Sequence, residues 1–242
     1  MIVNLQSQGW EVIYHRAHAL LAAQIAGYWH VDKASYRLYE TIAAISHHDD
    51  LEKEWEDDQL TEAGAPLDFT LERETATAQL HRHVAEALYR GRWVALLTSM
   101  HLCYLNQGKA AKSDDIADFL TEQHQLQAEW RDQLDVSKEE ALSAYDFMRW
   151  CDRLSLILCQ RQVPAANRTL EITTGPDDQN YWIHQLEDGR YGVDPWPFTL
   201  DTFTVNVDTC HLPQLQFASN DELTHALKAA PRHLVFWTLT RP

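Results

Sequence analysis

Apolar residues recur at helical spacing through the first two thirds of the chain. From about Gly9 to Gln162 they return every three or four positions, and Pro66 is the only proline in that stretch. This period is typical of amphipathic helices that bury one face. The sequence therefore predicts a mostly helical segment with one long loop, 56–69, which is acidic at its start and contains Gly64. Such a loop would be placed to act as a lid.

From Arg168 onward, short runs rich in β-branched and aromatic residues replace the helical period. Turn signals separate the runs RTLEIT, NYWIHQL, FTVNVDT and HLVFWTL, which predict about five β-strands. The segment SNDELTHALKAA predicts one short helix capped by Ser219 or Asn220. We therefore expect a mainly α domain over residues 1–165 with a β-rich C-terminal extension, residues 166–242, packed on it. The overall class would be α+β.

Composition excludes several classes of function. A formal net charge of −16, from 20 Lys+Arg against 36 Asp+Glu, argues against a nucleic-acid partner. The start, MIVNLQSQGW, does not resemble a secretory signal, and no apolar run approaches the roughly 20 residues that cross a bilayer. We expect a cytoplasmic protein without a membrane partner. The four cysteines lie in apolar contexts without Cys-x-x-Cys spacing, which favours buried free thiols.

Residues that can bind metals lie on faces that should point inward. His18 and His101 each share a helical face with apolar residues three, four or seven positions away. The pair His48–Asp49, inside the quartet HHDD, lies where an apolar face ends, and Asp152 lies in a nearly continuous apolar run. Taken singly, each could be a hydrogen-bonded core histidine, an ion-paired carboxylate or a solvated helix end. Their joint occurrence on separate helices favours convergence on one metal ion.

The order His, His-Asp, late Asp resembles the HD superfamily of metal-dependent phosphohydrolases. This resemblance implies an HD-like helical domain with His18, His48, Asp49 and Asp152 as metal ligands. The chain also resembles a bacterial family of domains of unknown function. The segments that carry this second resemblance are HRAHALLAAQIAGYW, SHHDDLEKEW, TSMHLCYL, CDRLSLILC and DPWPF. It implies a shared fold without a known activity, and Leu51 departs from the glycine of the commoner pattern.

Imidazole and carboxylate ligands suit a divalent transition metal such as Mn, Fe, Co, Ni or Zn. Such an ion lowers the pKa of a bound water and polarises a phosphoryl oxygen. We expect Asp49 to bind the metal and to act in catalysis, with Asp50 or His47 orienting the water. His101 would extend the ligand set. Either His81 or His83 would help His101 to reach a second ion.

Two arginines beside Asp152 on the same predicted helix, Arg149 and Arg153, are candidates to neutralise a phosphate, with Arg153 preferred. The segment DPWPF would pack the second part of the chain on the first, or form a wall of the site. These residues lead to the hypothesis that the protein is a metal-dependent hydrolase of a small phosphorylated or nucleotide-like compound. The alternatives are a non-catalytic binding or scaffold protein and a di-iron oxygenase, and the metal content would discriminate among the three.

Overall fold

The computed structural model describes residues 1–30, 37–51, 53–56, 58–71, 76–166 and 168–242. The helices are α1 (His15–Tyr28), α2 (Leu38–His47), α3 (Thr77–Ala87), η1 (Leu88–Arg90), α4 (Arg92–Asn106), η2 (Gln107–Lys112), α5 (Asp114–Leu134), α6 (Lys138–Cys159) and α7 (Asn220–Ala229). The strands are β1 (Ile2–Gln6), β2 (Gly9–Ile13), β3 (Thr169–Thr174), β4 (Asn180–Gln185), β5 (Tyr191–Asp194), β6 (Thr202–Leu212) and β7 (Arg232–Thr240).

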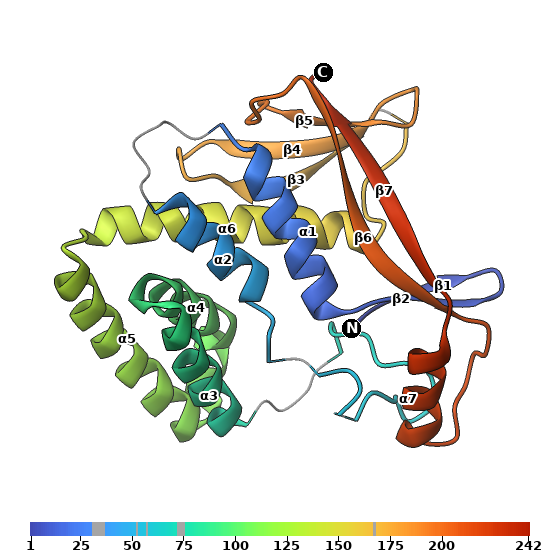
Figure 1. Ribbon diagram of the computed structural model, residues 1–242, viewed down its shortest axis with the longest axis horizontal. Helices are drawn as coiled ribbons and strands as arrows, with labels where there is room; N and C mark the ends of the chain where they lie inside the picture. The colour runs from blue at the N-terminus through green and yellow to red at the C-terminus, as the bar shows by residue number, and fades with distance from the viewer. Residues whose placement is uncertain (31–36, 52, 57, 72–75, 167) are drawn as a thin grey trace.

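One curled, seven-stranded sheet runs through the molecule in the order β1-β2-β6-β7-β5-β4-β3 (Figure 1). Its neighbouring strands are antiparallel except for β5 and β7. α1 packs on β6 and α6 packs on β3, while α3, α4 and α5 form a group beyond α2 (Figure 1). The helices that approach the sheet most closely therefore come from both halves of the helical segment.

This architecture corrects the expected mainly α, HD-like domain. The structure is 49% helical and 22% strand, and both ends of the chain enter the same sheet. Residues 2–13, inside the domain 1–165 that was expected to be mainly α, form the hairpin β1–β2, whose Trp10 pairs with Leu212 of β6. Helical period did not reveal this hairpin because its partner strand lies about two hundred residues away. The division at residue 165 into two domains stays a prediction.

A glycine makes the hairpin possible. Gly9 begins β2 with a φ of 116°, a conformation that side chains disfavour, and a Cβ at this position would collide with the backbone of Leu212. The turn is short, since Gln6 pairs directly with Gly9. A local signal was therefore present: a glycine after three polar residues, between two runs rich in apolar residues.

The other strand and helix predictions agree with the structure. β3, β4, β6 and β7 coincide with the four predicted runs, and Ser219 caps α7 by accepting a hydrogen bond from the backbone N–H of Glu222. All four cysteines are buried and free. Among the described residues, no helix is long and apolar enough to cross a membrane.

α6 is the axis of the helical part. It begins with a capping box, in which Ser137 and Glu140 each accept a hydrogen bond from the other's backbone N–H. Its 22 residues run between the helical group and strands β3 and β4 (Figure 1). Buried residues recur along it every three or four positions, from Ala141 through Met148 to Cys159. This period directs Asp152 toward α1 and α2.

Candidate metal centre

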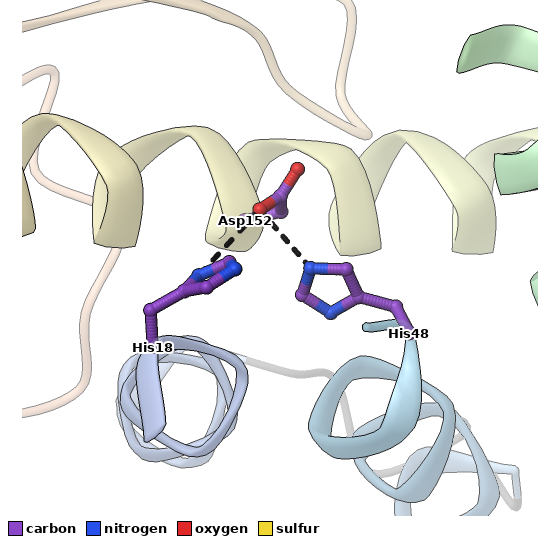
Figure 2. Close-up of side chains that lie close together, drawn as sticks. All are labelled: His18, His48 and Asp152. Carbon is purple, nitrogen blue, oxygen red and sulfur yellow. Dashed lines mark hydrogen bonds and ion pairs between the residues drawn. The ribbon is translucent and has the colours of Figure 1, made fainter. Parts of the chain in front are cut away.

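Three helices bring imidazoles and carboxylates together in the interior. His18 comes from the first half of α1, and His48 and Asp49 follow directly on the last residue of α2. Figure 2 shows the His18 and His48 side chains pointing toward Asp152 on α6. One ligand atom from each of His18, His48 and Asp152 lies within 4.8 Å of the others. Asp49 completes the group, because its Oδ2 lies 2.6 Å from His18 Nε2.

The protonation of the His48 ring is fixed by the backbone. Its Nδ1 lies 2.6 Å from the carbonyl oxygen of Ile45. A carbonyl can only accept a hydrogen bond, so Nδ1 carries a proton and the neutral ring has its lone pair on Nε2. This Nε2 lies 3.2 Å from Asp152 Oδ1 and 3.7 Å from Asp49 Oδ2. A lone pair facing two carboxylates is stable only when the ring gains a second proton or a cation lies between them.

His18 repeats this arrangement from the neighbouring helix. The Ser155 hydroxyl donates to the backbone carbonyl of Asp152 at 2.8 Å, and its oxygen lies 3.0 Å from His18 Nδ1. The hydroxyl oxygen can thus accept the Nδ1 proton. In that arrangement the lone pair of His18 Nε2 faces Asp49 Oδ2. In both imidazoles Nδ1 then holds its proton in a hydrogen bond, and the unprotonated Nε2 lies beside a carboxylate. Histidines that bind a metal through Nε2 have this arrangement.

Burial and charge act in opposite directions on these groups. Burial would lower the pKa of His48, but the charges of Asp49 and Asp152 raise it to about 10. Burial lowers the pKa of His18, although Asp49 opposes this. For both carboxylates, burial would raise the pKa, but His48, His18 and the neighbouring histidines together outweigh it and hold the pKa below the usual value. With two ionised carboxylates against one imidazolium, the group attracts a further cation.

Another histidine, His101 of α4, adjoins this group. It is 2% exposed, and its ring centroid lies 5.0 Å from that of His48. Together with His48 and Asp49 it offers a second set of ligand atoms within 4.8 Å of one another. Burial and the His48 charge lower the pKa of His101 to about 4, so the ring is neutral at pH 7. Its Nδ1 has no hydrogen-bond partner among the described residues.

The other sequence candidates lie elsewhere. His83 donates from Nε2 to the backbone carbonyl of His48 at 3.0 Å, which supports the turn but uses that nitrogen. His81 lies 3.7 Å from Glu122 on α5. Arg149 pairs with Asp146 at 3.0 Å and lies over the ring of Tyr104.

Arg153, the preferred phosphate-binding candidate, is partly exposed. It forms no hydrogen bond or ion pair with another described residue, so its contact with a substrate stays a prediction.

Asp50 faces arginines rather than the histidine group. Its Oδ2 lies 2.9 Å from His47 Nδ1 and 3.3 Å from Arg90 Nη2. The Arg16 guanidinium reaches its backbone carbonyl at 2.7 Å and its Oδ1 at 3.7 Å. These contacts join the end of α2 to α1 and η1. The expected role of Asp50 or His47 in orienting a water stays a prediction.

Sequence reasoning missed a second buried polar group beside the first. Glu54 accepts a hydrogen bond from the backbone N–H of His15 at 2.7 Å, and its Oε1 also lies 3.2 Å from His15 Nδ1. The amino group of Met1 lies 2.8 Å from the same Nδ1. Burial would raise the pKa of Glu54, but His15 and the amino group lower it to about 2. The signal was weak, since nothing local shows that Glu54 is buried.

The loop 56–69 is held at several points, with residue 57 outside the described residues. Asp68 accepts a hydrogen bond from the backbone N–H of Val3 at 2.9 Å. The backbone N–H of Gln59 donates to the side chain of Asn220 at 2.8 Å. These contacts hold the loop against β1 and the start of α7. The expected action as a lid stays a prediction.

Comparison with known proteins assigns the chain to a sequence family but does not assign an activity. Neither the curated proteins nor the solved structures contain a significant match. A sequence family described as "Protein of unknown function (DUF3891)" matches residues 1–214, a range that includes every residue of the group around His48. Since the match covers most of the 242 residues, the chain belongs to this family of unknown function, DUF3891.

Proposed function

We propose that this protein is a metal-dependent hydrolase of a small phosphorylated compound, with one divalent transition-metal ion held by His18, His48, Asp49 and Asp152. The observation that carries the proposal is the His48 ring. Its Nδ1 proton is committed to the Ile45 carbonyl, while its Nε2 faces two carboxylates within 3.7 Å. Among biological cations, a transition metal matches two imidazole nitrogens and two carboxylate oxygens in both charge and ligand type.

The residues present fit such an ion. Two carboxylates balance its charge, and His101 offers a further neutral nitrogen. The His18 and His48 side chains are 1% exposed, whereas those of Asp49 and Asp152 are 22% and 13% exposed. The solvent side of the centre is therefore its carboxylate side. A divalent ion there would lower the pKa of a bound water and polarise a phosphoryl oxygen.

The surrounding residues would hold the ligands in place. Ile45 and Ser155 fix the direction of the His48 and His18 rings, and His83 supports the backbone of His48. Such contacts from outside the ligand set raise metal affinity by orienting the ligands. They would also keep both Nε2 atoms deprotonated and directed inward when an ion is bound.

An anionic substrate is supported by the arginines around Asp50. Arg16 and Arg90 both reach the residue that follows Asp49, and their side chains are 50% and 38% exposed. Two guanidinium groups around one carboxylate leave donors for a second anion. In a chain with a net charge of −16, this is a local excess of positive charge beside the proposed centre. A phosphate group approaching from the carboxylate side would be attracted there.

A second candidate is a non-catalytic metal-binding protein. The burial of both imidazoles favours it, because structural metal sites are closed while catalytic ones keep an open position. The two candidates make the same prediction for metal content and opposite predictions for turnover.

The first experiment measures metal in protein purified without chelators, by inductively coupled plasma mass spectrometry. We expect about one equivalent of a transition metal per chain in the parent protein, and loss of that metal in Asp152→Asn. The matched control is Asp146→Asn, which changes an ion-paired carboxylate on the same helix, six residues earlier. Equal metal content in Asp152→Asn and Asp146→Asn would refute the metal centre.

The second experiment measures phosphate release from a panel of nucleotides and phosphomonoesters, with Mn, Fe, Co, Ni or Zn supplied. We expect turnover of at least one compound by the parent protein and none by Asp49→Asn, whose fold is checked by circular dichroism. A metal-loaded protein that is inactive on the whole panel would refute the hydrolase and support the non-catalytic candidate.

A further inference from the structure

A cavity of about 890 Å³ lies at the opposite ends of α1 and α2 from the candidate metal centre. Seven segments of the described chain contribute to it: the end of α1, the starts of α2 and α4, the first half of α6, the β3–β4 turn, residues 195–198 and Arg241. None of the four proposed metal ligands lines it. Its volume falls within the roughly 300–1,000 Å³ typical of small-molecule sites.

Aromatic rings dominate the walls. Trp29 lies at the centre, with ring centroids 5.3 Å from Phe147, 5.6 Å from Tyr181 and 6.0 Å from Phe198. Trp196 extends the group, at 4.9 Å from Phe198. Tyr181 and Phe198 are buried, whereas Trp29 and Trp196 are partly exposed. The cavity therefore offers ring surfaces between a closed floor and an accessible rim.

The segment DPWPF is part of this wall. The backbone N–H of His30 donates to the Pro197 carbonyl at 2.8 Å, and Thr199 donates to the Tyr28 carbonyl at 3.0 Å. The segment thus packs the strands on the end of α1, as the simpler sequence interpretation held. Because it does so at the cavity, the same contacts fix the positions of Trp196 and Phe198.

Helix geometry separates the cavity from the metal centre. Trp29 follows His18 by eleven residues, about 16 Å along α1, and Thr41 precedes His48 by seven residues, about 10 Å along α2. Ile45 of α2 and Trp150 of α6 are fully buried between the two regions, although on α6 the lining residue Phe147 precedes Asp152 by five residues, about 8 Å. A molecule in the cavity would not contact the metal ligands.

The charged residues of the lining have partners of their own. Arg241 pairs with Asp201 at 2.9 Å, and Asp177 accepts the hydroxyl hydrogen bond of Tyr181 at 2.8 Å. Glu140 accepts from the backbone of Ser137 at the start of α6. Arg37, the other charged lining residue, pairs with Glu40 at 3.2 Å. Because these charged groups already have ionic or hydrogen-bond partners, we expect ring contacts rather than ionic contacts to dominate recognition.

We propose that this cavity binds a small, planar, uncharged aromatic compound against the ring cluster formed by Trp29, Phe147, Trp196 and Phe198, as a site separate from the metal centre. Contact between aromatic rings stabilises a complex beyond the area that it buries. The accessible ring surfaces of Trp29 and Trp196 suit a flat molecule better than a branched aliphatic one.

The test uses prodan, a neutral naphthalene dye whose fluorescence shifts to the blue in apolar surroundings. We expect saturable binding of one dye per chain. Ala144→Phe should weaken it at least several-fold, because Ala144 lines the cavity on α6 and the added ring would occupy part of the space. Ala128→Phe on α5 is the control, since it adds the same ring at an exposed helical position outside the cavity. Ser143→Trp, at a second lining position, replaces Ala144→Phe if that variant does not fold.

The same titration is repeated after metal chelation and in Asp152→Asn. Unchanged dye binding in both is expected from a separate site, whatever the outcome of the metal experiments. The proposal is overturned if binding does not saturate, or if a folded Ala144→Phe or Ser143→Trp binds the dye like the parent protein. Loss of dye binding on chelation would overturn the separation of the two sites.

Discussion

The quartet His47-His48-Asp49-Asp50 forms two pairs with opposite surroundings. His48 and Asp49 turn inward, where their closest charged or titratable partners are His18 and Asp152. His47 pairs with Asp50, and Asp50 in turn meets Arg90, which is charged at all ordinary pH values. Two histidines and two aspartates that are consecutive in sequence thus lie in two different electrostatic environments.

The difference shows where a metal ion is required. The carboxylate of Asp50 has guanidinium partners, so its charge is compensated without any addition. The inward carboxylates have only imidazoles, and one of these, His48, must take a second proton to act as a cation. Without a metal ion, the charges of Asp49 and Asp152 therefore depend on the buried His48 imidazolium for compensation. A divalent ion would replace this imidazolium as the compensating cation. The predictions below test this contrast.

The largest effect is expected on removing the metal. A ligand present at about a thousand times its dissociation constant stabilises the native state by about 4 kcal/mol. For a chain of this size, chelation should lower the melting temperature by about 10 °C. Differential scanning calorimetry with and without a chelator measures this shift. Asp152→Asn should melt at the same temperature in both conditions, and a parent protein insensitive to the chelator would contradict the contrast.

Glu54 provides a buried carboxylate whose cation is supplied by the chain. Its pKa falls from an ordinary 4.5 to about 2 in the folded protein. This corresponds to at most about 3 kcal/mol of stability. Because the folded pKa is the lower one, the contribution is complete above pH 4.5 and is lost as the pH falls toward 2.

Glu54→Gln should remove this contribution at pH 7 without changing the metal content. Urea denaturation at pH 7 and at pH 3 measures the loss, and the difference between variant and parent should be smaller at pH 3. A difference independent of pH would mean that packing, rather than charge, makes Glu54 important. Glu56→Gln is a control in a solvent-exposed ion pair two residues later.

A smaller effect is expected for the His47–Asp50 pair. Partly exposed ion pairs contribute about 0–1 kcal/mol, so Asp50→Asn should lower the free energy of unfolding by no more than about 1 kcal/mol. It should also retain the metal, whereas the neighbouring change Asp49→Asn should lose it. Metal analysis of the two variants side by side decides the point. Loss of metal from Asp50→Asn would show that the two pairs act as one unit.

The smallest effect on stability is expected for Arg90→Gln, within about 0.5 kcal/mol. If the protein is a phosphate-releasing hydrolase, this variant should raise KM several-fold and leave kcat near the parent value, because Arg90 would contribute to binding alone. Arg153→Gln is the comparison suggested by the sequence. A larger rise in KM for Arg153→Gln than for Arg90→Gln would move the phosphate contact to α6.

The chemistry of the candidate centre could be predicted from the sequence because helical period is local. Spacing alone directs His18 and Asp152 to the buried faces of their helices, and the structure places them together with His48. The strands after Arg168 and the cap at Ser219 were predicted for the same reason: alternation and capping depend on neighbours in the chain.

Contacts between distant segments decided the rest. The hairpin of residues 2–13 becomes part of a seven-stranded sheet only through β6, so its neighbours in sequence could not reveal the fold. Asp49 and Asp50 turn to opposite sides of the end of α2, and this direction decides that one meets histidines and the other meets arginines. The direction of the His18 ring likewise depends on Ser155, 137 residues away. Sequence periodicity determines which face of a helix is buried, whereas tertiary packing determines what that face meets.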